Sequence, residues 1–209
     1  VYFDCGSSKI RAGAFNNSNV KNSFYCDGDF FPNHSNIELE VQKIITSLEG
    51  NTEEYLNDIN LMIDSPKMLS VSISISKKLD GSILQKKDIQ FLIQDAKQQV
   101  LRNYSDQSII HIIVKNYKID NSEYIFLPDN IDCKLISLDI LFICLPKEVK
   151  EYYKKIFFNL GISINQIFCT SYAKSVNYKD NFPNIDNLSF VDMGFNKTSI
   201  THFIKNEIF

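Results

Sequence analysis

The sequence predicts an α/β domain that is interrupted by a smaller α+β domain. Short apolar runs alternate with amphipathic helical patterns over residues 1–66 and 146–209, as expected for a sheet covered by helices. Residues 67–145 break this alternation with the order strand, helix, strand, strand. With 209 residues, 44% of them hydrophobic, the chain is long enough to bury a substantial core. We therefore expect a discontinuous outer domain and one inserted subdomain.

The outer domain begins with two strands and a helix. Apolar runs at residues 1–3 and 10–15 predict strands on either side of a turn. Residues 37–48 carry apolar side chains three and four positions apart, which predicts a helix. Residues 51–55 either continue this helix or begin a second one, and a short strand is expected at residues 59–63.

The insert opens with a strictly alternating segment. Residues 71–76 read Val-Ser-Ile-Ser-Ile-Ser, which predicts a strand with one buried and one solvent-facing side. Residues 88–101 place their apolar side chains on one helical face. The other expected elements are strands at 109–114, 124–127 and 138–144, with turns at 80–81 and 121–122.

The chain then returns to the outer domain through a helix at residues 147–159, whose apolar residues share one face. The remaining expected elements are strands at 164–168, 188–191 and 200–209, a helix at 171–175 and a polar connector at 177–187.

The charge distribution argues against a nucleic-acid partner. The formal net charge is -3, with 22 basic and 25 acidic residues well mixed along the chain. The mixed charges form no basic patch of the kind that follows a nucleic-acid phosphate backbone. Arg11 and Arg102 are the only arginines, so recognition through arginine forks is not expected either.

The composition favours a reducing, cytoplasmic environment. No run approaches the roughly 18 apolar residues of a membrane helix, and no signal peptide precedes the first strand. The five cysteines are odd in number and lack Cys-x-x-Cys spacing, which argues against a disulfide framework and a zinc site. Cys5, Cys144 and Cys169 are expected to be small packing residues, and His111 a core or edge residue of its strand.

Two turns with an Asp and a Gly are the most informative motifs. Asp4-Cys5-Gly6-Ser7-Ser8-Lys9 and Asp192-Met193-Gly194-Phe195-Asn196-Lys197-Thr198 each follow an apolar run. Such turns can bind phosphate, because glycine allows close backbone approach, N–H groups attract anions and hydroxyls donate hydrogen bonds. The candidate phosphate-binding residues are Gly6, Ser7, Ser8, Lys9, Gly194, Asn196 and Thr198. Asp4 and Asp192 are candidates to hold Mg²⁺ through its water molecules.

These segments resemble the actin-like ATPase superfamily and, within it, the FtsA family of bacterial division proteins. Residues 4–9 are similar to the family's first motif, Asp-x-Gly-Thr/Ser-Ser/Thr-Lys. Residues 109–120 are similar to the family's strand that ends in Tyr-x-Val-Asp, and residues 135–146 to the segment that returns to the nucleotide domain. Residues 160–164 resemble a Gly-Leu-x-Val segment, and residues 191–194 the second phosphate motif.

The resemblance implies a fold and a ligand. The fold is an actin-like ATPase (ribonuclease H-like) subdomain, residues 1–66 plus 146–209, with an SHS2-type insert at residues 67–145. The implied ligand is ATP with Mg²⁺, bound between two lobes, with at most weak ATPase activity. The chain is expected to be the first half of such a protein and to bind ATP weakly by itself, because one lobe offers few charge-assisted hydrogen bonds against the cost of association.

The second turn departs from the family pattern. Phe195 and Asn196 stand where glycines are usual, and Lys197 stands where the first Thr is usual. Asn tolerates a left-handed backbone position, whereas Phe195 would be strained in one. Lys197 adds a charge that can pair with phosphate, so phosphate binding is expected to be retained but altered.

By the same resemblance, the partners are FtsZ, later division proteins and further copies of the protein in filaments. The implied location is the cytoplasmic face of the inner membrane at the division site, reached through a C-terminal helix that this chain lacks. Exposed strand edges at residues 71–76 or 109–114 could pair with neighbouring molecules. The alternative is that both strands are internal to the sheet of the insert.

Three other functions compete with this interpretation. An actin-superfamily small-molecule kinase needs a positioned catalytic Asp or Glu in its insert, and none is evident. A ribonuclease-like nuclease needs two further carboxylates beside Asp4 and Asp192 and a basic face. A type IV pilus actin-like assembly protein is a nearer relative, but residues 117–120 and the Val-Asp-Met-Gly context of the second motif favour FtsA.

Overall fold

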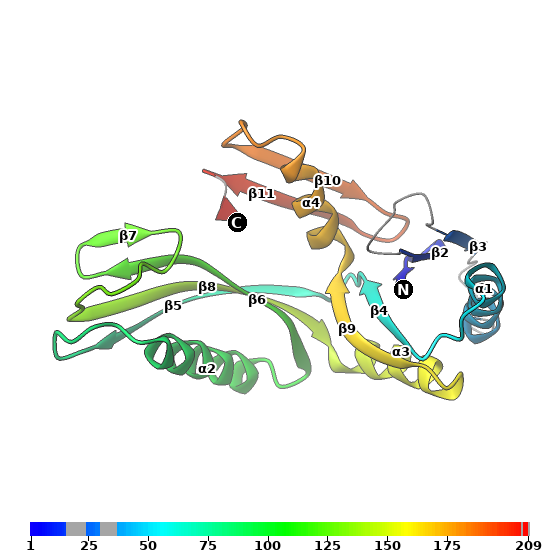
Figure 1. The fold of residues 1–209 in the computed structure, drawn as a ribbon, viewed down its shortest axis with the longest axis horizontal. Helices are drawn as coiled ribbons and strands as arrows, with labels where there is room; N and C mark the ends of the chain where they lie inside the picture. The colour runs from blue at the N-terminus through cyan, green and yellow to red at the C-terminus, as the bar shows by residue number, and fades with distance from the viewer. Residues whose placement is uncertain (16–23, 30–36, 206, 209) are drawn as a thin grey trace. The chain divides into compact units, whose positions relative to one another are not determined.

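The computed structural model describes residues 1–15, 24–29, 37–205 and 207–208. The chain forms two compact units. The first is made of Val1–Pro66 and Glu148–Asn206, and the second of Lys67–Lys147 and Glu207–Phe209 (Figure 1). None of the helices among the described residues is long and apolar enough to cross a membrane.

A sheet and its helices make up most of the first unit. They are β1 (Tyr2–Cys5), β2 (Lys9–Ala14), β3 (Phe24–Asp29), α1 (Ile37–Thr52), β4 (Asp58–Ile63), α3 (Lys147–Asn159), β9 (Ser163–Cys169) and α4 (Thr170–Asp180). The strand order is β3-β2-β1-β4-β9. The β1–β2 and β2–β3 pairs are antiparallel, whereas β4 runs parallel to both β1 and β9.

The core of this unit explains why its strands and helices form where they do. The apolar residues of α1 lie at helical spacing on one face and are buried, and Leu48 is fully buried among them. The ring of Phe3 on β1 meets that of Phe157 on α3 edge to face, with 5.3 Å between centroids. Because β1 and β4 are parallel with Cys5 opposite Ile63, both strands end at the same edge of the sheet.

A second hairpin follows α4 and stays separate from the five-stranded sheet. It consists of β10 (Leu188–Met193) and β11 (Thr198–Ile204), and β12 (Glu207–Ile208) follows. One face of the hairpin packs on α4, where the Phe190 ring stacks on Tyr178 at 5.8 Å and meets Phe203 at 6.0 Å. The expected strand at residues 188–191 therefore exists, but its partner is β11 and not a strand of the first sheet.

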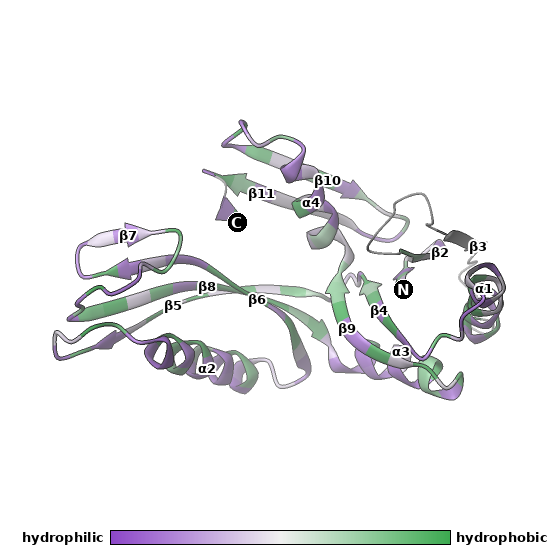
Figure 2. Ribbon diagram, in the orientation of Figure 1, coloured by the Kyte–Doolittle hydropathy of each residue, from purple (hydrophilic) through white to green (hydrophobic). Residues whose placement is uncertain are grey.

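The second unit is a four-stranded antiparallel sheet with one long helix. Its elements are β5 (Leu69–Lys78), α2 (Lys86–Asn103), β6 (Gln107–Ile119), β7 (Ser122–Tyr124) and β8 (Leu135–Pro146). The strand order is β5-β8-β6-β7, and α2 runs along the sheet (Figure 1). Leu92 and Ala96 of α2 are buried against β8, where hydrophobic residues recur (Figure 2). The alternation predicted at residues 71–76 is confirmed, with half-buried apolar residues and exposed serines.

Several predicted boundaries were wrong, for local reasons. The expected strand at 124–127 is β7, which ends at Tyr124, because Asp120 takes a left-handed φ of 52° and turns the chain early. Residues 51 and 52 continue α1, as one of the two expectations had it, and left-handed Glu53 (φ 57°) follows, so residues 51–55 do not form a second helix. The other differences are that α4 runs from Thr170 to Asp180 into the expected connector, that β11 ends at Ile204, and that β3 had not been predicted. Residues 206 and 209 of the expected last strand lie outside the described residues.

Candidate functional site

The turns of the β1–β2 and β10–β11 hairpins are closed by equivalent backbone hydrogen bonds. In the first, the Gly6 N–H donates to the Lys9 carbonyl at 3.0 Å, directly after the Cys5–Ile10 pair. In the second, the Gly194 N–H donates to the Lys197 carbonyl at 2.8 Å, directly after the Met193–Thr198 pair. Gly6 therefore corresponds to Gly194, and Lys9 to Lys197.

Close backbone approach explains the glycine in each turn. A Cβ at Gly6 would lie 2.9 Å from the Lys9 carbonyl oxygen, and one at Gly194 would lie 3.0 Å from that of Lys197. Neither glycine has a positive φ. The N–H groups of both glycines are used inside the turns, so ligand binding would depend on other groups nearby.

The expectation about strain in the second turn was wrong. Neither Phe195 nor Asn196 has a positive φ, so the turn contains no left-handed position for Asn196 to fill and none to strain Phe195. Thr198 also lies outside the turn, since it is the first residue of β11 and corresponds in register to Ile10. Beyond its glycine, the second turn consists of an aromatic ring, an amide and an ammonium group, where the first turn has two serines and a lysine.

Both turns face one polar cleft of about 300 Å³. Of the candidate residues, Gly6, Ser7, Ser8, Gly194 and Asn196 line it, as do the carboxylates of Asp4 and Asp192. Lys9 and Thr198 are exposed and do not line it. The other charged or hydroxyl residues of the lining are Arg11, Asp64, Thr170, Lys174, Lys197 and Ser199.

Asp4, at the end of β1, is largely buried and held by hydrogen bonding. The Thr170 hydroxyl donates to Asp4 Oδ1 at 3.2 Å, and Arg11 Nη1 lies 3.7 Å from Oδ2. Burial raises the pKa of the Asp4 carboxyl, and this effect outweighs the opposing influence of the nearby Lys174 ammonium. The Asp4 carboxylate is thus kept at a cost in solvation, among side chains that donate hydrogen bonds or carry positive charge.

Asp64 is the main residue that the sequence reasoning missed. It follows β4 and accepts hydrogen bonds from Ser171, from the backbone N–H at 3.2 Å and from the hydroxyl at 3.1 Å. Lys197 Nζ lies 3.2 Å from Asp64 Oδ1. A signal was present, because an Asp directly after a buried strand that runs parallel to β1 must lie at the same sheet edge as the first turn.

Asp192 is paired with another residue that was not predicted, Lys174 of α4. Lys174 Nζ donates to Asp192 Oδ2 at 3.3 Å. Within the residues that the structure describes, no group of three or more His, Cys, Asp or Glu side chains is arranged to hold a metal ion. The donor set therefore suits an anion better than a directly bound Mg²⁺, because the carboxylates already face basic groups.

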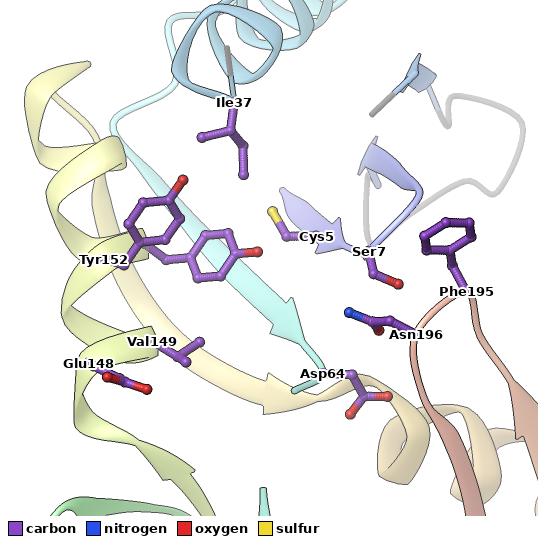
Figure 3. Close-up of a pocket in the computed structure, with 11 residues that line it drawn as sticks. Cys5, Ser7, Ile37, Asp64, Glu148, Val149, Tyr152, Phe195 and Asn196 are labelled. Atoms are coloured by element: carbon purple, nitrogen blue, oxygen red, sulfur yellow. The ribbon is translucent and has the colours of Figure 1, made fainter. Parts of the chain in front are cut away.

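An apolar pocket of about 420 Å³ adjoins the cleft. Figure 3 shows Ser7 of the first turn and Asn196 of the second facing it, with Tyr152 of α3 on the opposite side. Burial raises the pKa of the Cys5 thiol and of the Tyr153 hydroxyl, so both stay protonated at neutral pH. Among the described residues, Cys5, Cys133, Cys144 and Cys169 are buried and form no disulfide, which agrees with a packing role for Cys5, Cys144 and Cys169.

This arrangement of parallel and antiparallel strands, helices and paired turns, with an α+β insert, defines an actin-like ATPase fold. The fold is similar to that of a solved structure from the "PilM-PilN type IV pilus biogenesis complex". The match covers 99% of this chain, with a TM-score of 0.65 and 9% sequence identity. The chain spans 58% of the length of that protein.

The sequence identifies the insert. Residues 67–144 match the family model described as the SHS2 domain inserted in FtsA. No curated protein matches the sequence. The chain therefore has an actin-like fold that carries an SHS2 insert of the FtsA type.

Proposed function

We propose that this chain is the nucleotide-binding part of an FtsA-type division protein that assembles into filaments. In this proposal the protein tethers the FtsZ ring to the cytoplasmic face of the inner membrane and recruits later division proteins. The observation that supports it is the polar cleft, because two turns closed by the same type of hydrogen bond line it from separate hairpins.

The chemistry of the cleft supports a phosphate ligand. The hydroxyls of Ser7 and Ser8 and the Asn196 amide can donate to phosphate oxygens, and Lys197 and Lys174 bring positive charge. Hydrogen bonds to charged groups contribute roughly 1.5–3 kcal/mol each. Because association itself costs free energy, a few such bonds give tight binding only if the protein also contacts the rest of the nucleotide.

The strand edges of the insert support filament assembly. Along β5, the pairing partner is β8, and β7 pairs with β6 only from Tyr117 to Ile119. Among the described residues, β5 and the first part of β6 are therefore sheet edges, as one of the two sequence interpretations expected. Open edges can add a strand from another molecule.

Isothermal titration of the purified full-length protein with ATP tests the nucleotide proposal. We expect a micromolar dissociation constant for the full-length protein and a millimolar one for the 209-residue chain. Ser7→Ala combined with Ser8→Ala should weaken binding about tenfold through the lost donors, while Ser82→Ala, in the insert, should not. Absence of any heat of binding to the full-length protein would overturn the proposal.

A role in type IV pilus assembly is the second candidate. The fold likeness to the PilM structure over nearly the whole chain supports it, while the FtsA-type insert supports division. Pull-down experiments with FtsZ and with PilN discriminate the two. Retention of FtsZ alone would support the division role, and retention of PilN alone would support the pilus role.

A further inference from the structure

The carboxylates around the polar cleft are balanced by basic side chains of the same protein. The pairs are Arg11–Asp4 at 3.7 Å, Lys197–Asp64 at 3.2 Å and Lys174–Asp192 at 3.3 Å. Negative charge that would otherwise attract a divalent cation is therefore already neutralised. The polar cleft has no net negative charge from these residues with which to hold Mg²⁺.

Lys197 differs from the other two basic residues in its position. It belongs to the second turn itself, yet its ammonium reaches Asp64, which follows β4 in the five-stranded sheet. Its side chain is only 22% exposed, as is that of Asp64. The positive charge is therefore held within the cleft and is only partly screened by water.

We propose that the Lys197 ammonium takes the place of a divalent cation in this cleft, so that the protein binds a nucleoside triphosphate without Mg²⁺. This inference rests on the nucleotide function proposed above. An ammonium has three donors, so Lys197 can keep Asp64 and still donate to phosphate oxygens. Asp64 then fixes the position of the ammonium and is a positioning residue.

The charges explain why a metal and Lys197 compete. A divalent cation near the phosphates would share the small cleft with a held ammonium, and like charges at short range repel each other strongly where water is partly excluded. A polyphosphate without metal brings only negative charge and meets three basic groups, from Lys197, Lys174 and Arg11, each of which has more N–H donors than its carboxylate partner uses. The cleft should therefore bind the free nucleotide at least as tightly as its magnesium complex.

The decisive experiment compares ATP binding by the purified full-length protein with excess Mg²⁺ and with excess EDTA. We expect the dissociation constant in EDTA to equal or fall below that in Mg²⁺. Inorganic tripolyphosphate serves as a second probe, because it reports on the phosphate site without the nucleoside. A dissociation constant at least tenfold higher in EDTA would overturn the inference while leaving nucleotide binding intact.

Substitutions of Lys197 test whether its side chain causes the metal-free binding. Lys197→Ala should weaken binding in EDTA about tenfold or more and make binding depend on Mg²⁺, whereas Lys197→Arg should retain metal-free binding. Lys43→Ala is the matched control, since Lys43 is exposed on α1, pairs with Glu40 and lies away from the cleft. If Lys197→Ala weakened nucleotide binding equally in Mg²⁺ and in EDTA, Lys197 would not be taking the place of a divalent cation.

The result also separates this inference from the proposed function. If ATP and tripolyphosphate bind under neither condition, the nucleotide function is wrong and the inference fails with it. If both bind only with Mg²⁺, the function stands and the role of Lys197 is overturned. If Lys197→Ala fails to fold, the comparison between Mg²⁺ and EDTA with the unmodified protein still decides the question.

Discussion

Lys197 Nζ lies 3.2 Å from Asp64 Oδ1 and joins the turn of the second hairpin to the residue that follows β4. The two residues are far apart in the sequence, and each side chain is 22% exposed. The pair is partly buried, so the cost of removing its two charges from water and of ordering their side chains offsets much of their attraction, and its net contribution to stability is expected to be small. The arrangement therefore bears more on what the cleft binds than on whether the protein folds.

Lys197→Met tests that separation. We expect the free energy of unfolding in urea to fall by no more than about 1 kcal/mol. A loss above about 3 kcal/mol would instead indicate a pair whose breakage leaves a buried charge. The same protein sample should be used for nucleotide titration, so that stability and binding are compared directly.

Alanine at the turn glycines should destabilise the protein. The added Cβ would approach a carbonyl oxygen within 2.9 Å at Gly6 and 3.0 Å at Gly194, so each turn must shift, at a cost of about 1–3 kcal/mol. Gly50→Ala is the control, since Gly50 lies in α1 with nothing within 4 Å of the added atom. It should stabilise by about 0.5–1 kcal/mol, because alanine favours helix. Urea denaturation measures the stability of the three alanine variants. Equal effects at Gly6, Gly194 and Gly50 would show that close approach to a carbonyl oxygen is not the cause.

Phe195→Gly should leave stability almost unchanged. Phe195 is 70% exposed and has no positive φ, so its replacement should change the free energy of unfolding by no more than about 0.5 kcal/mol beyond the entropy cost of glycine. Stabilisation by about 1 kcal/mol or more would show that the phenylalanine strains this turn after all. Thermal unfolding of the two proteins under one buffer condition gives the answer.

Asp4 and Asp80 should respond to pH with opposite signs. Burial raises the pKa of Asp4 in the folded state, so the folded protein holds this proton more tightly and loses stability as pH rises through the window between the unfolded and folded pKa values. Asp4→Asn should therefore stabilise the protein at neutral pH, with no gain at pH values where Asp4 is protonated in both states.

Asp80 supplies the contrast. Hydrogen bonds from Ser82, including one from its N–H at 3.0 Å, lower the pKa of Asp80. Its contribution to stability is present above the unfolded pKa and is lost as pH falls through the folded pKa. Asp80→Asn should destabilise at neutral pH. Urea titrations of both variants across acidic and neutral pH measure the two trends, and parallel trends would contradict the assigned causes.

A charged side chain on the edge of the insert should block assembly. Ser72 is exposed on β5, which pairs with β8 and is an edge strand of its sheet among the described residues. Ser72→Lys should reduce filament formation by the full-length protein, since lysine on an edge strand prevents strand addition. Gln94→Lys adds the same charge on the exposed side of α2 and should have no effect. Sedimentation measures both, and filaments of Ser72→Lys at the normal level would exclude this edge.

Elements with local sequence signals could be predicted without the structure. The helix at residues 147–159 was predicted with the bounds that the structure has, because its apolar residues repeat at helical spacing. The alternating serines of β5 predicted its exposed side, and the two turns were recognisable from Asp, Gly and their flanking apolar strands.

The residues that complete the cleft could be identified from the three-dimensional arrangement alone. Asp64 gained its role from β4 running parallel to β1, and Lys174 and Lys197 gained theirs from contacts with Asp192 and Asp64. The turn conformations around Asp120 and Phe195 also followed from backbone geometry that residue type alone does not fix. Residue spacing along the chain fixes which side of a helix or strand is buried. The pairing between Asp64 and Lys197 instead joins residues that are distant in the sequence, so it exists only once the strands that carry them have packed together.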